Sequence, residues 1–508
     1  MIKPSLSEKL LSDIPAAVVV FLVALPLCLG IALASDANPI SGIIAGMVGG
    51  MVVGALSGSP LSVSGPAAGL TAIVAVAITE LQSYEIFLVS VMIAGVIQII
   101  MGYAKAGMIS YYIPDAVIQG MLAAIGLLLI IKQIPFLLGD EKNTLTNFLH
   151  ALSIKKLSLK QLIAITDFVN PLAFLIGVIS LVILLLYENK HIKQHRFSKL
   201  LPAPLLVVTI GMLINNIAEK ITTSVALKKM QLVSLPIFEQ PISFFTSLSQ
   251  PNIDGFTQPQ VWLTAITIAI VASLESLLSI EAVDQLDPEK RITSPHRELK
   301  AQGVGNLVSG FLGGLPITSV IVRSSANVNA RASSKLASIF HGFLLLMSVL
   351  FLPEWLNQIP NASLAAILIF TGYKLANIAL FKSYLKKPWD QGLPFMITIL
   401  AILISNLLAG ILLGMLVALF FSNRFKLKNG ISVIEEKDNT LIIFEKEVYF
   451  FNKGTLKTIL QRIAPGTTVW MNTSASVFID QDIVDMMHDF VLHAESRDII
   501  VHLKTKEG

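Results

Sequence analysis

The chain has 508 residues, of which 54% are hydrophobic and only 14% are charged, with a mean hydropathy of +0.74. Soluble proteins carry about 25% charged residues, so this composition indicates a polytopic membrane protein. The net charge of +4 suggests no nucleic-acid partner, and the single cysteine, Cys28, excludes a disulfide within the chain.

The N-terminal tail, residues 1–12, is predicted to lie in the cytoplasm and lacks the cleavage site of a signal peptide. A membrane-crossing helix needs roughly 20 apolar residues. Long apolar segments occur at 14–34, 86–104, 113–133, 169–187, 260–281 and 336–352. Shorter or interrupted ones occur at 40–57, 64–80, 202–217, 298–313, 318–330, 361–373, 391–406 and 408–423. We predict 14 spans within 13–425, spans 1–7 at about 13–217 and spans 8–14 at about 260–423.

The loop charges orient these spans. An even number of crossings places both termini on one side. With that side in the cytoplasm, the inside flanks and loops hold 20 Lys and Arg residues, and the outside loops hold 8. This bias follows the positive-inside rule and predicts a multi-pass protein with both termini cytoplasmic.

A broken apolar segment occurs at residues 54–69, GALSGSPLSVSGPAAG, which contain four glycines and two prolines. The spacing G-x3-G-x-P-x-[ST] begins at Gly54 and again at Gly310. In chain order, span 3 is residues 64–80 and span 10 is residues 318–330. These two spans run in opposite directions in the predicted topology, so the halves of the chain are predicted to be inverted repeats. Matched broken segments indicate a transporter site. Close helix packing through glycines is the alternative, but it requires neither the prolines nor the repeat.

A half-helix that starts within the membrane exposes unpaired N–H groups and a positive dipole end. Two such starts facing each other are predicted to form a small anion cradle. Pro66 suits the first turn of a helix, because it has no N–H to lose. Hydroxyl donors are available from Ser62, Ser64, Thr318 and Ser319.

Two charged residues fall within predicted spans. Arg323 lies about one and a half turns along span 10 and adds positive potential to the cradle; snorkelling to the interface is its alternative role. Glu275 lies in the middle of span 8, where it would repel an anion unless a cation or proton neutralised it. We therefore predict a Na⁺ or H⁺ coupling site at Glu275, with Ser279 one turn on as a hydroxyl ligand. A structural pair with Arg323 is the alternative.

After residue 425 the chain becomes more polar. Residues 430–508 are predicted to form a hairpin, a helix at 454–464, a strand at 467–474, a second helix at 483–495 and a last strand at 497–503. This order indicates a small cytoplasmic α/β domain. It contains no phosphate-binding loop and no metal-ligand cluster, and His488 and His493 are predicted to be solvated.

Several segments resemble the SulP anion transporters of the sulfate permease–prestin family: DIPAAVVVFLVALPLCLGIALA, SGSPLSVSGPAAGLTAIV, LESLLSIEAVD, HRELKAQGVGNLVSGFLGGLPITSVIVRSSANVNA and AAILIFTGYKL. The resemblance covers residues 10 to about 425. It implies a 7+7 inverted-repeat fold with a core domain of spans 1–4 and 8–11 and a gate domain of spans 5–7 and 12–14. It also implies elevator-like alternating access and a homodimer. The C-terminal domain resembles a short, divergent STAS domain.

Within that family, ALPLCLGIALASD and SVSGPAAGLT are most similar to cyanobacterial sodium-dependent bicarbonate transporters, and Leu27 stands where many sulfate transporters have Gln. Their sodium-binding acid, an Asp, falls on Glu275 and the hydroxyl four residues later on Ser279. Glu also occurs there in proton-coupled members. The implied anion cradle is Ser64, Gly65, Pro66, Ala67, Ile317, Thr318, Ser319 and Arg323, and Thr318 is also assigned to the cation site.

The sequence thus predicts a secondary active transporter of a small inorganic anion in the bacterial inner membrane. Bicarbonate coupled to Na⁺ comes first, and a proton-coupled sulfate or dicarboxylate symporter or an anion exchanger is the alternative. No cofactor is expected beyond the coupling ion, and the expected partners are the anion, membrane lipid and a second copy of the chain. A passive channel and a nucleobase permease are further alternatives, although span 10 has no carboxylate to read a base edge. No nucleophile–base pair or metal cluster suggests an enzyme.

Overall fold

The computed structural model describes residues 6–107, 113–140, 169–189, 201–221, 226–238, 241–405, 407–421, 430–436, 439–445, 447–449, 452–476, 478–494 and 498–504. The basic segments 190–199 and 424–428, which entered the orientation argument, and most of 132–168 lie outside them. The chain divides into two compact units: Met1–Gly107 with Leu122–Asn377, and Met108–Met121 with Ile378–Gly508.

A helix occurs in each of the 14 predicted spans. The first half contains α1 (Leu6–Ala34), α2 (Pro39–Val48) continuing through the π-helical η1 (Gly49–Val53) into α3 (Gly54–Leu56), α4 (Thr71–Leu81), α5 (Tyr84–Tyr103), α6 (Asp115–Leu138), α9 (Pro171–Tyr187) and α12 (Ala203–Ile221). The second contains α14 (Pro259–Leu286), α15 (Pro295–Phe311), α16 (Ile321–Asn329), α17 (Leu336–Phe351), α19 (Asn361–Leu375), α21 (Trp389–Ile404) and α22 (Leu407–Phe421). The predicted order of spans in a 7+7 repeat is therefore confirmed.

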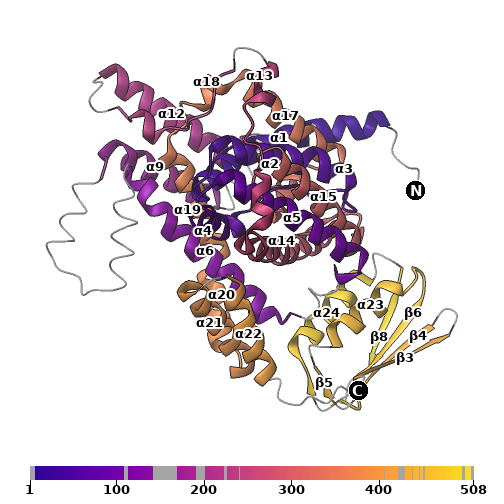
Figure 1. The fold of residues 1–508 in the computed structure, drawn as a ribbon. Helices are drawn as coiled ribbons and strands as arrows, with labels where there is room; N and C mark the ends of the chain where they lie inside the picture. The colour runs from indigo at the N-terminus through magenta and orange to yellow at the C-terminus, as the bar shows by residue number, and fades with distance from the viewer. Residues whose placement is uncertain are drawn as a thin grey trace. The chain divides into compact units, whose positions relative to one another are not determined.

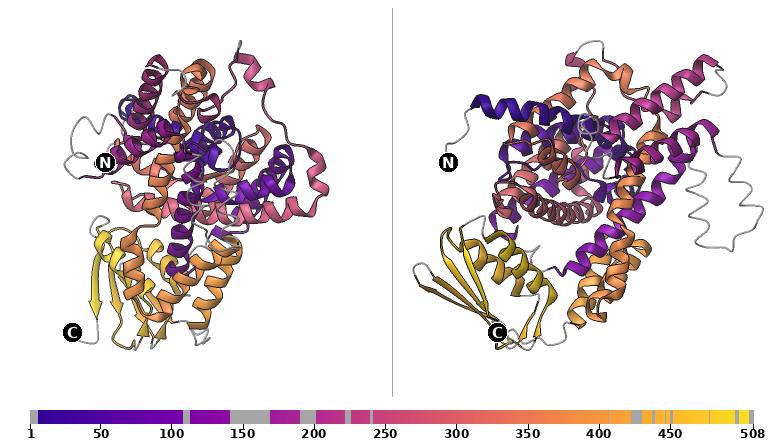
Figure 2. Two further views of the ribbon diagram at one scale, coloured as in Figure 1. Left: turned by 90° about the vertical axis from the view of Figure 1, so that its left-hand side faces the viewer. Right: turned by 180° about the vertical axis from the view of Figure 1, so that it is seen from behind.

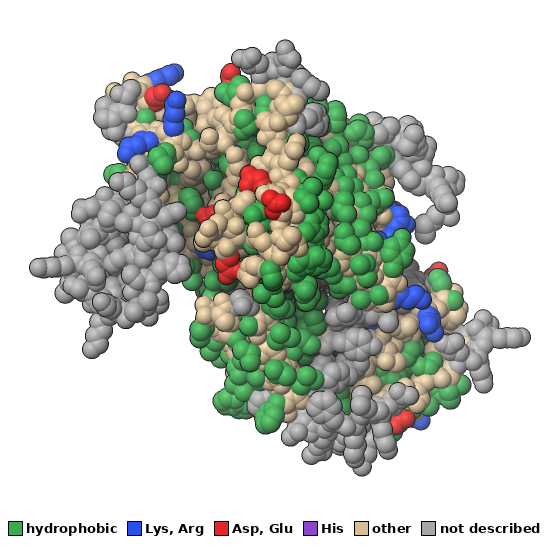
Figure 3. Space-filling model, viewed as in Figure 1, with side chains coloured by type: hydrophobic (Ala, Val, Ile, Leu, Met, Phe, Trp, Pro, Cys, Tyr) green, Lys and Arg blue, Asp and Glu red, His purple; other side chains and the backbone are tan. Residues whose placement is uncertain are grey.

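Short elements join these helices: η4 (Lys229–Gln231), α13 (Pro241–Thr246), η5 (Ile253–Thr257), α18 (Pro353–Leu356) and α20 (Ile378–Lys386). Seven of the described helices are long and apolar enough to cross a bilayer. Large apolar side chains remain exposed on these helices, among them Ile100, Leu213 and Leu263. Hydrophobic side chains also cover much of the face seen in Figure 3. Such a surface suits contact with lipid, because soluble proteins rarely expose large contiguous apolar patches.

Within the first unit, α5, α14 and α15 pack side by side, as do α1 and α17 (Figure 1). The segment that was predicted to be half-helix 3 differs from expectation in one respect. Its helix begins at Thr71, whereas Ser64–Pro66 form a short strand, β1. The prediction that Pro66 starts a helix was therefore wrong. Its backbone is extended because β1 pairs with β2 (Ile317–Ser319), a strand from the other half of the chain.

The C-terminal domain lies in the second unit and has the predicted order of elements. Its strands are β3 (Ile431–Glu436), β4 (Asn439–Phe444), β5 (Glu447–Val448), β6 (Thr468–Asn472), β7 (Phe478–Ile479) and β8 (Ile500–Lys504), and its helices are α23 (Lys453–Arg462) and α24 (Gln481–Ala494). The main sheet has the order β3-β4-β6-β8, with β3 antiparallel to β4 and the remaining pairs parallel. Figure 2 shows the strands and helices of this domain in two further views.

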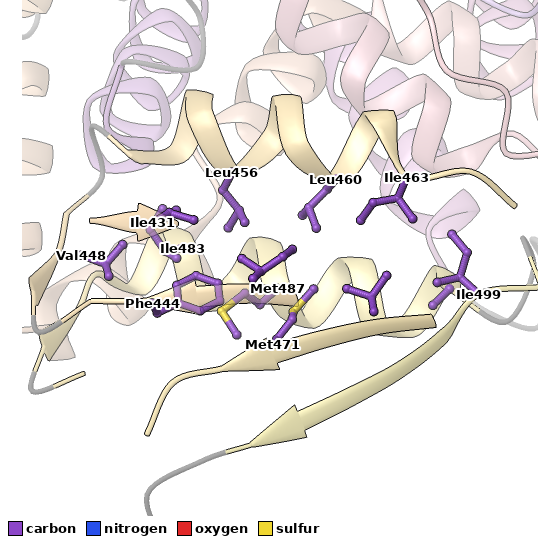
Figure 4. Close-up of a cluster of buried hydrophobic side chains, with 13 residues drawn as sticks. Ile431, Phe444, Val448, Leu456, Leu460, Ile463, Met471, Ile483, Met487 and Ile499 are labelled. Carbon is purple, nitrogen blue, oxygen red and sulfur yellow. The ribbon is translucent and has the colours of Figure 1, made fainter. Parts of the chain in front are cut away.

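The core of this domain lies between the sheet and the helices α23 and α24 (Figure 4). Leu456 and Leu460 of α23 point toward Phe444 of β4 and Met471 of β6, and all four are buried. Burying a side chain of this size contributes roughly 1.5–3 kcal/mol. An apolar core of this kind explains why alternating strands and amphipathic helices were readable from sequence. The result is the α/β domain that the STAS-like resemblance predicted.

Three charged groups meet where α23, α24 and the start of α6 pack together in the second unit. Lys453 Nζ lies 2.6 Å from Asp115 Oδ1 and 3.8 Å from Asp482 Oδ2, and Asp482 Oδ2 accepts a hydrogen bond of 3.1 Å from the Asp115 N–H. Burial, followed by the nearby Asp115 charge, raises the pKa of Asp482 to about 6, and Lys453 only partly opposes this. The folded domain therefore holds a proton that the unfolded chain releases near pH 4.

We expect this proton to make the α24 region less stable as the pH rises from about 4 to about 6, by an amount on the order of 2 kcal/mol. Asp482→Asn should flatten that dependence and raise stability above pH 6, because the amide carries no charge. Hydrogen exchange of residues 478–494 in the full-length protein, compared between variants at each pH, measures it. Asp485→Asn on the same helix is the control. An unchanged pH dependence in Asp482→Asn would assign the effect to other groups.

Candidate functional site

The predicted cradle residues meet in a two-stranded antiparallel sheet that joins the two halves of the chain. Ser64 pairs with Ser319, Gly65 with Thr318, and Pro66 with Ile317. Beyond β1 the chain passes through the 3-10 helix η2 (Ala68–Leu70) into α4, and beyond β2 it enters α16. Ser64, Ala67 and the three residues of β2 are at most 3% exposed, and Gly65 and Pro66 are also buried, so the sheet is closed from solvent.

The sequence repeat and the strand pairing differ in register. The repeated G-x3-G-x-P-x-[ST] spacing matches Ser62 with Thr318, but the structure pairs Thr318 with Gly65. Pro316 directly precedes β2, whereas residues 61–63 separate Pro60 from β1. Ser62 nevertheless lies at the cradle, because its Oγ is 2.5 Å from the Ser319 Oγ. The extra residues in the first half therefore shift which side chains are equivalent.

Arg323 lies in the first turn of α16, closer to the helix start than predicted, and its side chain is 0% exposed. Its Nη2 donates a hydrogen bond of 3.4 Å to the Pro66 carbonyl. Its Nη1 comes so close to Gly65 that a Cβ there would lie 2.0 Å away. Nε and Nη1 have no hydrogen-bond partner among the described residues. A guanidinium in this position does not snorkel to the interface; it directs unpaired donors into the interior beside β1.

Glu275 lies in the middle of α14 and faces η2. A Cβ at Gly69 would lie 2.8 Å from its Oε2, so glycine makes room for the carboxylate. Oε2 has no hydrogen-bond partner among the described residues. Among the described residues, Glu275 also forms no ion pair with Arg323. The alternative role of Glu275, a structural ion pair with Arg323, therefore finds no support.

Thr318 provides a second unpaired oxygen near α14. The residue is 0% exposed and its Oγ1 finds no hydrogen-bond partner in the described part of the chain. Helix α14 packs against β2, and Ser276 Oγ accepts a hydrogen bond of 3.2 Å from the Ser319 N–H. Ser279, one turn beyond Glu275 on α14, is also buried. Buried oxygens without partners are costly, so Glu275 and Thr318 are suited to a cation or proton.

A row of polar residues on α15 supports both strands, and sequence reasoning missed it. Glu298, Gln302 and Asn306 recur at four-residue intervals and are 0% exposed. The Asn306 side chain donates to the Ile317 carbonyl at 3.1 Å and accepts from the Ile317 N–H at 2.6 Å, as a neighbouring strand would. Gln302 Nε2 donates to Ser64 Oγ at 2.8 Å. The four-residue spacing of these polar residues could have revealed the row in the sequence, because residues four apart lie on one face of a helix.

The glycines around the sheet also allow close packing, as the alternative interpretation proposed. A Cβ on Gly49, at the start of η1, would lie 2.5 Å from the Ser64 carbonyl oxygen. The π-helical turn thus places backbone directly against β1. Close packing and the broken helices are therefore not competing explanations, because the packing holds the strand that interrupts the helix.

The comparisons with known proteins agree with this architecture. The model of the sulfate permease family matches residues 10–401. A Bacillus subtilis protein named "Putative sulfate transporter YvdB" is 26% identical over 82% of this chain and 74% of its own length. The bicarbonate transporter BicA of a Picosynechococcus strain is 22% identical over 84% of this chain and 72% of its own length.

Solved structures show the same fold. The transmembrane domain of a cyanobacterial bicarbonate transporter, BicA, aligns with a TM-score of 0.64 at 22% identity and covers 82% of this chain and 98% of that one. The structure of SLC26A9 aligns with a TM-score of 0.68 at 14% identity, covering 99% of this chain and 85% of that one. The second alignment extends the shared fold to the C-terminal α/β domain.

Proposed function

This chain belongs to the sulfate permease family of multi-pass membrane anion transporters, which are not enzymes, and we propose that it carries bicarbonate together with Na⁺. The observation that carries the proposal is the pair of strands β1 and β2 with the buried guanidinium of Arg323 beside them. The guanidinium has two unpaired nitrogens among the described residues, Nε and Nη1. A small anion is the ligand that pairs them.

The cradle favours a monoanion. In the described part of the chain, Arg323 is the fixed cation against the strands, joined by hydroxyls of Ser62, Ser64, Thr318 and Ser319. A buried charge is tolerated when it is paired and hydrogen-bonded. One guanidinium balances one negative charge, whereas a dianion would leave a second charge to be balanced.

The unpaired oxygens of Glu275 and Thr318 favour Na⁺ as the coupling ion. A proton needs one oxygen and would occupy Glu275 alone. A metal cation of this kind takes several oxygen ligands, and the two unpaired oxygens come from different elements, α14 and β2. In this proposal Glu275, Thr318 and Ser279 hold Na⁺. Its charge offsets that of Glu275 and so permits an anion to bind nearby.

Transport is proposed to follow an elevator-like alternating access. The cradle residues and Glu275 lie on spans 3, 8 and 10, all of which the resemblance assigns to the core domain, and the strands are buried. A site built within one domain can be carried as a body from one side of the membrane to the other. The proposal also includes a homodimer in the bacterial inner membrane, with lipid around it and both termini in the cytoplasm.

The test is uptake of labelled bicarbonate and labelled sulfate into proteoliposomes, with and without an inward Na⁺ gradient. We expect Na⁺-driven bicarbonate accumulation. Accumulation against a gradient also excludes a passive channel. Uptake of neither anion would overturn the proposal.

A proton-coupled sulfate or dicarboxylate symporter is the second candidate. One support is the Bacillus subtilis relative that is named as a putative sulfate transporter. The other is Glu275 itself, because the resemblance implies Asp at this position in sodium-coupled members. In the same assay it predicts sulfate uptake that ignores Na⁺ and follows an inward proton gradient. That result would leave the proposed anion site unchanged, and it would mean that Glu275 binds a proton rather than Na⁺.

A further inference from the structure

We propose that Glu298 is a positioning residue that orients the Ser64 hydroxyl toward the transported anion by fixing the amide of Gln302. The inference rests on the proposed function, because it assumes that the anion binds at β1. The inference is drawn from a chain of buried hydrogen bonds that runs from Ser57 through Glu298 and Gln302 to Ser64.

The carboxylate of Glu298 determines which way the Gln302 amide faces. Gln302 Nε2 donates to Glu298 Oε1 at 2.8 Å, and Ser57 Oγ donates to Glu298 Oε2 at 2.5 Å. Both carboxyl oxygens of Glu298 accept hydrogen bonds in this arrangement, so Glu298 selects the amide orientation that presents N–H rather than C=O. The cost of that orientation is visible: Gln302 Oε1 is buried and has no partner among the described residues.

The amide in turn determines what Ser64 can do. Gln302 Nε2 has two N–H groups, and both are used, one on Glu298 and the other on Ser64 Oγ. Because Ser64 Oγ accepts a hydrogen bond from Gln302, its own proton is left for another acceptor. Ser64 belongs to β1 and pairs with Ser319, so that proton lies at the cradle. A flipped amide would accept the Ser64 proton and remove one donor from the anion.

The experiment measures the KM and maximal rate of uptake for Glu298→Gln, Ser64→Ala and the double variant in proteoliposomes, normalised to reconstituted protein. A glutamine at 298 keeps the shape but no longer selects one amide orientation of Gln302. We expect KM for the anion to rise about tenfold in each single variant, the effect of losing a hydrogen bond to an ionised group, with the maximal rate within about twofold. The double variant should be no worse than Ser64→Ala, because Glu298 acts through Ser64.

Asp13→Asn is the matched control. Asp13 is also a carboxylate with 0% exposure, and it accepts hydrogen bonds from Ser333 and Ser334 with no bond to either strand. Its variant should change thermal stability without changing KM. An additive double variant, or a fall in maximal rate with unchanged KM in Glu298→Gln, would show that Glu298 is merely structural.

The outcomes also separate this inference from the proposed function. If the unaltered protein transports no anion, the proposed function fails. If transport is intact but Ser64→Ala leaves KM unchanged, the cradle is elsewhere. If Ser64→Ala raises KM and Glu298→Gln does not, only the positioning role of Glu298 is wrong.

Discussion

Glu275→Gln is expected to lose Na⁺-driven anion accumulation by at least about tenfold while anion–anion exchange continues. The amide keeps the size of the side chain against Gly69 but removes the negative charge that would attract the cation. A lost interaction with a charged group corresponds to about tenfold or more. Labelled uptake with and without a Na⁺ gradient, compared with exchange at zero gradient, measures both properties.

Two further variants sharpen this test. Glu275→Asp keeps the charge, and the resemblance implies that sodium-coupled members use this residue, so it should retain Na⁺ dependence with an altered Na⁺ affinity. Glu281→Gln removes a carboxylate from the same helix, α14, and should leave coupling unchanged. Na⁺-driven accumulation that survives in Glu275→Gln would place the coupling site elsewhere.

Arg323→Met should abolish anion-dependent stabilisation and reduce uptake by about a hundredfold, yet raise the Tm of the anion-free protein by a few degrees. Arg323 is fully buried with two unpaired nitrogens among the described residues, so without an anion its charge destabilises the fold. Methionine fills similar space without that charge. Thermal unfolding with and without bicarbonate or sulfate, alongside uptake, measures both effects.

The control for this substitution is Arg331→Met, at an exposed position just after α16. It removes the same charge without touching the strands and should leave anion stabilisation intact. Arg323→Lys keeps a charge but loses the planar guanidinium, so it should recover only part of the uptake. A fall in the anion-free Tm of Arg323→Met would mean that Arg323 serves the fold rather than the anion.

Most of the architecture was readable from the sequence, because helices and strands follow local hydrophobic periodicity. Each predicted span contains a helix, and the C-terminal elements occur in the predicted order. The family motifs also selected residues that the structure brings together, from Ser64 to Pro66 and from Ile317 to Ser319. Intramembrane charges stand out in a chain with so few of them, which is why Glu275 and Arg323 were found.

The sequence by itself therefore determined the membrane fold, the two broken segments and the identity of the charged candidates. Only the tertiary structure decided that Pro66 lies in a strand, that Thr318 pairs with Gly65, and that the row from Glu298 to Asn306 supports both strands. The strand pairing and the Gln302–Ser64 hydrogen bond join segments roughly 240 to 255 residues apart, whereas Asn306 supports β2 from only 11 residues before it. A local pattern records which residues favour a helix or a strand, but pairing register and burial are set by which distant segments meet.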